Sequence, residues 1–156
     1  MQAKDLMTKP AVTILKTATL EEAAAMMLRG RFGSLPVVDE QSSELCGIIT
    51  ESDFAAKQAG VPFSTLMLPQ LFGEWLGNEV EPLMEKARKM HVADVMSRHV
   101  MVAHEDDSIP KILRLMLQHN VRRLPVLRNM IPVGIITRRD LLRLMAPNVA
   151  PPQASK

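Results

Sequence analysis

Gly134-Ile-Ile-Thr-Arg-Arg-Asp140 decides the fold of this chain, because Gly47-Ile-Ile-Thr-Glu-Ser-Asp53 repeats its glycine, both isoleucines, the threonine and the aspartate. The isoleucine pair favours a half-buried strand, and the glycine lets the chain turn into it. The threonine then stands where a helix begins. Thr-x-x-Asp is a capping arrangement in which the hydroxyl accepts from the third helical amide and the carboxylate reaches back. Each copy therefore predicts a buried strand that runs directly into a helix.

The similarity between the two halves extends beyond this stretch. At a shift of 89 residues Asp5 falls on Asp94, and the segment 35–37, Leu-Pro-Val, falls on its copy at 124–126. The shift drops to 87 at the Gly-Ile-Ile-Thr stretch, so two residues are lost between Val38 and Cys46. A hairpin loop tolerates such a deletion. The sequence therefore indicates an internal duplication.

Each copy predicts the order strand, helix, strand, strand, helix, because apolar residues follow a helical period and then a strand period. In the first copy the predicted elements are a strand at 12–14, a helix opened by Thr19 and Glu22 that runs to about Arg29, a hairpin of 34–38 and 45–50, and a helix from Glu51 to the Gly60 and Pro62 break. In the second copy they are a helix from Ser108, a hairpin of 123–127 and 133–137, and a helix from Arg138 to about Met145.

The chain divides into repeat 1 at residues 1–59, an insert at 60–90, repeat 2 at 91–146 and a flexible tail at 147–156. The insert matches nothing in the other half, and it holds three of the five aromatic residues of the chain: Phe63, Phe72 and Trp75. A disordered linker would not carry so many aromatic side chains. We expect the insert to be partly helical and to pack over the repeats or against a partner subunit.

Composition predicts a soluble, cytoplasmic protein. The 156 residues are 47% hydrophobic, which suffices for a core, yet no run of 18 apolar residues and no signal-peptide core occurs. A single cysteine, Cys46, excludes an internal disulfide. We expect a buried and unreactive thiol.

Charge is divided unevenly between the halves. Residues 1–90 hold nine Lys and Arg against twelve Asp and Glu, whereas residues 91–156 hold ten against five, so the halves carry −3 and +5. Arg138 and Arg139 stand in the first turn of the last predicted helix, where the helix dipole already favours negative charge. The basic half predicts either a solvated basic face or a site for a phosphate.

Catalytic and metal motifs do not appear in the sequence. His99 and His104 lie near three acidic residues, 105–107, but they lack paired ligand spacing and are better explained as surface-loop residues. No phosphate-binding glycine loop or nucleophile motif occurs. The absence of tyrosine and the single tryptophan make a base-stacking surface for nucleic acid unlikely. Asp53 and Asp140 are each next to a hydroxyl at a helix start, which suits holding a ligand more than moving protons.

With these motifs in place, the chain resembles tandem CBS-domain proteins, named after cystathionine β-synthase. The resemblance rests on two motifs that each occur twice and in order: the hydrophobic-Pro-Val hairpin at 35–38 and 124–127, and the Gly-Ile-Ile-Thr-x-x-Asp stretch. The segments 5–8, Asp-Leu-Met-Thr, and 94–97, Asp-Val-Met-Ser, fit the family as well. The resemblance implies an α+β fold of two β-α-β-β-α repeats, packed sheet to sheet about a pseudo-twofold axis with a helical insert between them.

The resemblance also implies two equivalent clefts that bind an adenosyl ligand: AMP, ADP, ATP or S-adenosylmethionine. Family geometry joins the Thr-x-x-Asp of one repeat to the opening strand and hairpin start of the other. One cleft would contain Thr137, Arg138, Arg139, Asp140, Thr8, Val12, Phe32, Gly33 and Ser34. The second would contain Thr50, Asp53, Ser97, Met101, Val121 and Arg122. By this resemblance the aspartate accepts from the ribose hydroxyls, the threonine bonds ribose or phosphate, and apolar strand residues hold adenine.

The two clefts are predicted to differ. Glu51 and Ser52 stand in repeat 1 where Arg138 and Arg139 stand in repeat 2, which sets a carboxylate where a phosphate would lie. Like charges at close range in a partly dry cleft disfavour binding. Arg122 could compensate from the opposite repeat. We therefore rank the Thr137/Asp140 cleft first for phosphate-bearing ligands and expect the other to be empty or to suit a less charged ligand.

The sequence thus favours a non-enzymatic regulatory module without a resident cofactor, which binds an adenosyl ligand, signals to an unidentified partner and forms a homodimer. One alternative is a structural dimerisation module in which the motifs are only helix caps. A third is an enzyme or a DNA-binding regulator that uses the basic half, although no helix-turn-helix pattern is visible.

Overall fold

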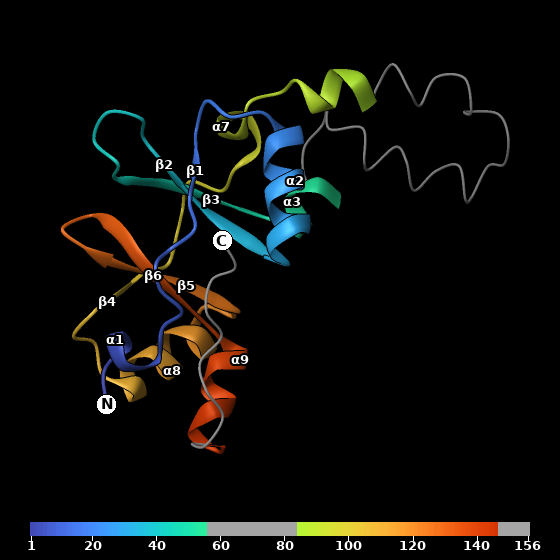
Figure 1. The fold of residues 1–156 in the computed structure, drawn as a ribbon. Helices are drawn as coiled ribbons and strands as arrows, with labels where there is room; N and C mark the ends of the chain where they lie inside the picture. Colours follow the sequence, from blue (N-terminus) through green and yellow to red (C-terminus); the bar gives the residue numbers. More distant parts are fainter. Residues whose placement is uncertain (56–83, 147–156) are drawn as a thin grey trace, which may run out of the picture.

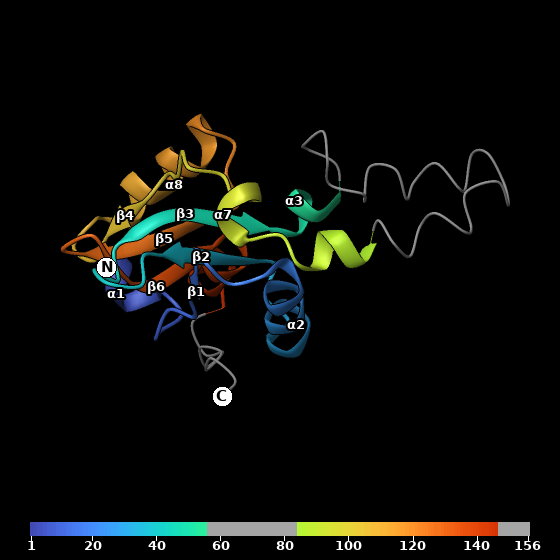
Figure 2. The same ribbon diagram turned by 90° about the horizontal axis from the view of Figure 1, so that it is seen from above.

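The structure, a computed structural model, describes residues 1–55 and 84–146. It is a mixed α+β fold of two three-stranded sheets, one for each repeat, and the sheets lie next to each other in the middle of the molecule (Figure 1 and Figure 2). The first repeat contains β1 (Ile14–Leu15), α2 (Leu20–Gly30), β2 (Ser34–Val38), β3 (Leu45–Thr50) and α3 (Glu51–Ala55). The second contains β4 (Ala103–His104), α8 (Ile109–Gln118), β5 (Arg123–Arg128), β6 (Ile131–Thr137), α9 (Arg138–Leu141) and the 3-10 helix η2 (Leu142–Leu144).

Both sheets have the same topology, which confirms the duplication. The first strand of each repeat runs parallel to the second, and the second pairs antiparallel with the third. Val37 faces Gly47 and Val126 faces Gly134, and the register shifts immediately after Val37 and after Val126. The second hairpin has the shorter connection, as the deletion predicts.

Two details differ from the sequence prediction, and the end of the insert agrees with it. The first strand begins at Ile14 rather than at residue 12, because the chain before it is tied elsewhere: the Ala11 amide donates to Val133 O of β6 at 3.1 Å. The last α-helix ends at Leu141, and the chain continues as a tighter 3-10 turn. Residues 84–88 at the end of the predicted insert are helical, with Ala87 buried, whereas residues 60–83 and the tail lie outside the described residues.

Two short helices, α1 (Ala3–Leu6) and α7 (Val92–Val95), were not predicted. Each of them is exchanged, which means that it packs into the core of the other repeat. Ala3, Leu6 and Met7 lie in the hydrophobic core of the second repeat, together with α8 and the second sheet. Val92, Val95 and Met96 lie in the core of the first repeat, together with α2 and the first sheet. Each core is therefore completed by the segment that precedes the other repeat's first strand.

This exchange explains why both motifs contain glycine. Gly134 lies inside β6 rather than at a turn, and an added Cβ would come within 2.5 Å of Met7 Sδ and 3.0 Å of the Thr8 carbonyl oxygen. Gly47 lies against Met96 and the Ser97 carbonyl in the same way. The glycine is thus needed for close approach of the exchanged segment. The sequence interpretation, that it lets the chain turn, is wrong.

We predict that Gly134→Ala lowers the free energy of unfolding by about 1–3 kcal/mol, because Met7 is buried and the Thr8 backbone cannot yield without breaking its bonds to β6. Urea denaturation measures the change. Arg114→Ala, at an exposed position of α8, serves as the control and should change stability by less than about 0.5 kcal/mol. Equal stability of Gly134→Ala and the unchanged chain would contradict the close-approach explanation.

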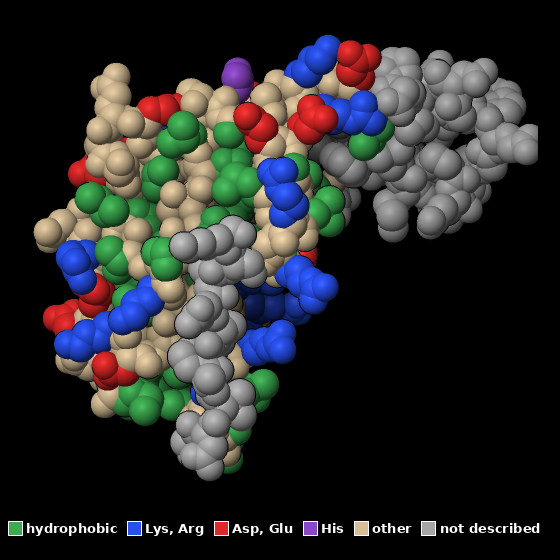
Figure 3. All heavy atoms as spheres, viewed as in Figure 1, with side chains coloured by type: hydrophobic (Ala, Val, Ile, Leu, Met, Phe, Trp, Pro, Cys, Tyr) green, Lys and Arg blue, Asp and Glu red, His purple; other side chains and the backbone are tan. Residues whose placement is uncertain are grey.

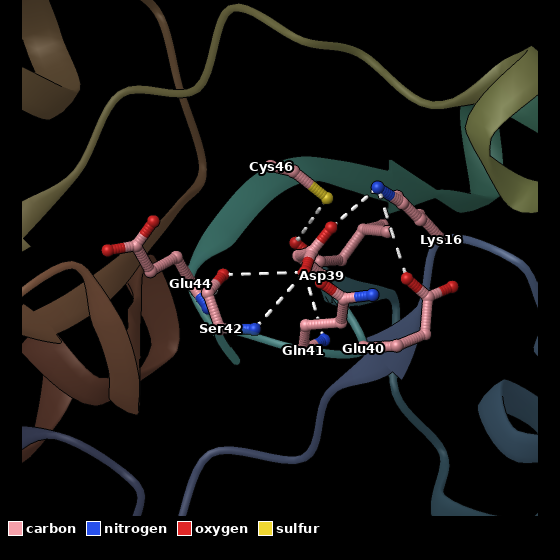
Figure 4. Close-up of polar contacts among 8 residues, drawn as sticks. Lys16, Asp39, Glu40, Gln41, Ser42, Glu44 and Cys46 are labelled. Atoms are coloured by element: carbon pink, nitrogen blue, oxygen red, sulfur yellow. Dashed lines mark hydrogen bonds and ion pairs between the residues drawn. The ribbon is translucent and has the colours of Figure 1, made fainter.

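An ion pair joins the ends of the first two strands in each repeat. The positive charge follows the first strand in repeat 1 and lies at the end of the second strand in repeat 2. Lys16 Nζ lies 2.5 Å from Asp39 Oδ2 and 3.9 Å from Glu40 (Figure 4). In the second repeat Glu105 takes the place of Lys16, and Arg128 takes the place of Asp39. Arg128 Nη2 donates to Glu105 Oε1 at 2.7 Å.

Cys46 lies beside the Lys16–Asp39 pair and is half-buried rather than fully buried. Its thiol donates to Val37 O, and burial raises its pKa, which fits an unreactive thiol.

The Asp39 pair predicts a pH dependence of stability. The hydrogen bond from Lys16, followed by those from the Ser42 and Gln41 amides, holds the pKa of Asp39 far below its usual range. A carboxylate with a lowered folded pKa contributes stability above its unfolded pKa, about 3.9, and loses it as pH falls through the folded value. The Tm difference between the unchanged chain and Asp39→Asn should therefore be largest near pH 7 and shrink below about pH 4. A difference that is constant down to pH 2 would contradict this.

Candidate functional site

The two Thr-x-x-Asp stretches form helix caps of nearly identical geometry. Asp140 Oδ2 accepts from the Thr137 amide and from Thr137 Oγ1, both at 2.7 Å. Asp53 Oδ2 accepts from the Thr50 amide at 2.7 Å and from Thr50 Oγ1 at 3.0 Å. Both aspartates are buried. The carboxylate half of the predicted cap is therefore present in both repeats, and in the second repeat Thr137 Oγ1 also accepts from the Asp140 amide at 3.3 Å. These bonds fix the orientation of each carboxylate.

Each cap lies close to the segment that arrives from the other repeat. Thr8 and Ile135 exchange two backbone hydrogen bonds, both at 3.0 Å, which places Thr8 on β6 two residues before Thr137. Ser97 and Ile48 do the same at 2.9 and 3.0 Å, two residues before Thr50. The predicted pairing of Thr8 with one cap and Ser97 with the other is thus consistent with the strand geometry.

The hairpin starts of the two repeats also meet. The Arg138 amide donates to Arg122 O at 3.0 Å, so the start of β5 lies beside the start of α9. Gly33 faces the Arg123 guanidinium closely enough that any Cβ on Gly33 would collide with it. Because Arg123 is the strand partner of Thr137, the first repeat's hairpin start reaches the Thr137 cap through this arginine. Sequence reasoning missed Arg123, although it occupies the position of Ser34 in the alignment of the repeats.

The remaining predicted residues divide into apolar lining and polar groups. Val12 and Phe32 pack against the first core, and Met101 and Val121 against the second. Ser34 is buried, and among the described residues its Oγ is the one buried side-chain polar atom without a hydrogen-bond partner. A buried hydroxyl without a partner is costly, so this atom is suited to bond a group that the described residues do not supply.

A difference between the caps was not visible in the motif itself. Arg143 Nη2 forms an ion pair with Asp140 Oδ1 at 3.0 Å, and the two side chains are 16% and 4% exposed. Arg143 Nη1 also donates to Leu6 O, at the end of α1. Among the described residues none donates to Asp53 Oδ1, and the sequence position equivalent to Arg143 is Ala56. The Asp-x-x-Arg spacing in the helix was the signal that could have revealed this pair.

Basic side chains gather at the edge of the molecule between α2 and α9, where the hairpin starts meet (Figure 3). Arg122, Arg138 and Arg139 are exposed. Arg138 Nη2 donates to Asn120 Oδ1 at 3.3 Å, so this guanidinium is turned toward the end of α8. Glu51 and Ser52, their counterparts in the first repeat, are exposed as well. The charge difference between the caps is therefore present at the surface.

Comparison with known proteins places this arrangement in a family. The sequence model of the CBS domain matches residues 3–60 and 92–147, which is well over half of the chain. The chain belongs to the CBS domain family. The CBS pair is also recognised in solved structures: the CBS domain of a CBS domain-containing membrane protein from Sphaerobacter thermophilus is 38% identical, with a TM-score of 0.72 over 92% of this chain and 87% of that one.

Further relatives cover most of the chain. The CBS domain pair of protein MJ0100, solved with 5′-methylthioadenosine and S-adenosyl-L-methionine, is 25% identical, with a TM-score of 0.67 over 96% of this chain and 98% of that one. The Bacillus subtilis protein YlbB is 29% identical over 88% of this chain and 78% of its own length. Other curated relatives are much longer: the chain spans 46% of MJ1225 and 22% of L-aspartate semialdehyde sulfurtransferase, both from Methanocaldococcus jannaschii.

The part of the CBS pair that the structure describes contains neither a metal site nor a membrane-spanning helix. No group of three His, Cys, Asp or Glu side chains is placed there to hold a metal ion, and His104 lies apart from any such group. No described helix combines the length and apolar character needed to cross a bilayer. The cytoplasmic location expected from the sequence stays a prediction.

The Arg143 pair predicts unequal stability effects of the two aspartates. Asp53→Ala should lower the free energy of unfolding by about 1 kcal/mol, the usual value of a cap. Asp140→Ala should cost about 2–4 kcal/mol, because it also leaves a largely buried guanidinium without its carboxylate. Urea denaturation of both variants checks this, and equal losses would contradict a stabilising role of the pair.

Proposed function

We propose that this CBS pair is a non-enzymatic regulatory module that binds an adenosyl ligand in two clefts between its repeats. The observation that carries the proposal is the duplicated arrangement in which a Thr-x-x-Asp cap of one repeat lies beside the exchanged segment of the other. The unpartnered Ser34 hydroxyl supports it, because a bound ligand would supply the missing hydrogen bond. The adenosyl ligands of the MJ0100 pair indicate the ligand class.

The proposed clefts contain the residues predicted from sequence, with Arg123 added to the first. In the Thr137/Asp140 cleft we propose that Arg123, Arg138 and Arg139 supply positive charge to one ligand, which favours a phosphate-bearing nucleotide such as AMP, ADP or ATP. The Thr50/Asp53 cleft has Glu51 at the corresponding place, which favours a ligand without phosphate there. Binding would then be signalled to a regulated protein through the surfaces of the repeats.

Exchange of the two charge pairs tests this proposal. Arg138→Glu with Arg139→Ser should weaken AMP binding far more than adenosine binding, because it removes two cations and adds a carboxylate. The expected loss for AMP is about tenfold to a hundredfold, and it should shrink at high salt because the residues are exposed. Calorimetry with both ligands at two salt concentrations gives the measurement.

The reciprocal variant is the matched control. Glu51→Arg with Ser52→Arg carries the opposite exchange in the other repeat and should strengthen AMP binding while leaving adenosine unchanged. If AMP and adenosine lose equal affinity in the first variant, the arginines do not meet the phosphate. If neither ligand binds the unchanged chain, the sensor function is wrong.

A structural dimerisation module is the second candidate, and one observation favours it. Large apolar side chains are exposed on the outer helices of both repeats: Leu28 of α2, Leu117 of α8, and Leu142 and Met145 after α9. Apolar patches of this kind commonly mark an interaction surface. The two functions are compatible, since a ligand-binding pair can also dimerise.

We predict a homodimer that uses these helices. Light scattering should give twice the 17.4 kDa mass of one chain, and Leu28→Glu with Leu117→Glu should reduce it to the monomer, because a buried charge without a partner is strongly unfavourable at an interface. Glu21→Gln with Lys111→Gln changes exposed charges on the same two helices and should leave the mass unchanged. A monomer mass at every concentration would overturn the prediction.

A further inference from the structure

The two cap aspartates differ in which of their oxygens remain able to accept hydrogen bonds. In each repeat Oδ2 is occupied by the amide and hydroxyl of the cap threonine, at 2.7–3.0 Å. Each carboxylate oxygen has two lone pairs, so Oδ2 is fully used in both repeats. Recognition of any ligand hydroxyl by Asp53 or Asp140 therefore depends on Oδ1.

Arg143 lies against this oxygen of Asp140. Its Nη2 lies 3.0 Å from Asp140 Oδ1, and the pair is largely shielded from water, with 16% and 4% of the side chains exposed. Nη1 donates to Leu6 O at 3.4 Å, which holds the guanidinium in place from the side of α1. Among the described residues Asp53 Oδ1 has no such donor, and Ala56 stands at the equivalent sequence position.

The consequence concerns the ribose. A 2′,3′-diol brings two hydroxyl donors, and at Asp140 these donors must share Oδ1 with the Arg143 guanidinium, which lies 3.0 Å away. The positive charge of the guanidinium also offsets the negative charge of the carboxylate, which reduces repulsion between Asp140 and a phosphate. Among the described residues no hydrogen-bond donor lies on Asp53 Oδ1.

We propose that Arg143 is a specificity-determining residue of the Asp140 cleft: it weakens recognition of ribose hydroxyls there and makes the phosphate the group that decides binding. This inference rests on the proposed adenosyl-binding function, and it makes the phosphate part of that ligand the one that the Asp140 cleft selects. Neither the repeated motif nor the charges of Arg138 and Arg139 predict this weak recognition of the ribose in the Asp140 cleft.

The test measures how much the ribose 2′-hydroxyl contributes in the Asp140 cleft. All proteins in the test also carry Asp53→Ala, so that binding is measured at the Asp140 cleft. Calorimetry then compares the Kd of AMP with that of 2′-deoxy-AMP. With Arg143 present, loss of the 2′-hydroxyl should change Kd less than about threefold. In Arg143→Met, which retains the packing of the stem, the same loss should cost about tenfold, the value of one charge-assisted hydrogen bond.

Arg139→Met is the matched control, because it removes one positive charge four residues away, from an exposed side chain of α9 that takes no part in the Asp140 contacts. It should weaken AMP and 2′-deoxy-AMP equally and leave their ratio unchanged. A purely structural role of Arg143 would change Tm but not this ratio. If Arg143→Met does not fold, Arg143→Lys replaces it: one ammonium cannot bond Asp140 and Leu6 O in the same way, so the ratio should still rise.

The outcomes separate this inference from the function on which it rests. AMP binding with an unchanged ratio in the Arg143 variants overturns the role of Arg143 and leaves the adenosyl-binding function intact. Absence of AMP and adenosine binding to the unchanged chain overturns the proposed function, and the inference with it.

Discussion

The close approach of the exchanged segments to the Gly-Ile-Ile-Thr strands is the constraint on which the rest of the structure depends. Met7 and Met96 can lie against β6 and β3 only because Gly134 and Gly47 carry no side chain. That approach allows Thr8 and Ser97 to bond the strands of the opposite repeats, and it inserts α1 and α7 into the opposite cores. Neither repeat has a complete core without the other, so the two behave as one unit whose caps are held at fixed positions relative to the exchanged segments.

The duplicated architecture then carries two different sites. Sequence duplication repeats the cap, the hairpin and the exchanged segment, and the hydrogen-bond distances at the two caps agree within 0.3 Å. Side chains around the caps differ between the repeats, where Glu51 and Ala56 of one repeat correspond to Arg138 and Arg143 of the other. The scaffold can remain symmetric while the charges differ, because Glu51, Arg138 and Arg143 lie outside the two cores.

Much of this fold could be predicted from the sequence, because local patterns determine it. The first hairpin, 34–38 and 45–50, has the predicted bounds, and Thr19 caps α2 with Glu22 as the capping box requires. The helices α1 and α7 could not be predicted, since four residues give no helical period and their stability comes from packing into a distant core. The function of the glycines and the contacts of Arg123 and Arg143 also depend on segments far apart in sequence, and single-sequence patterns do not report such contacts.

Methionine-methyl NMR tests the central claim, that the clefts between the repeats bind an adenosyl ligand, most directly. Met7 precedes Thr8, which we propose for the first cleft, and Met101 is proposed for the second, whereas Met27 and Met116 are buried in the two cores. In a titration of methyl-labelled protein with AMP, the Met7 signal should shift first, Met101 should follow only at higher concentration, and Met27 and Met116 should stay in place. Binding of AMP that leaves both Met7 and Met101 unshifted would place the ligand elsewhere and contradict the account.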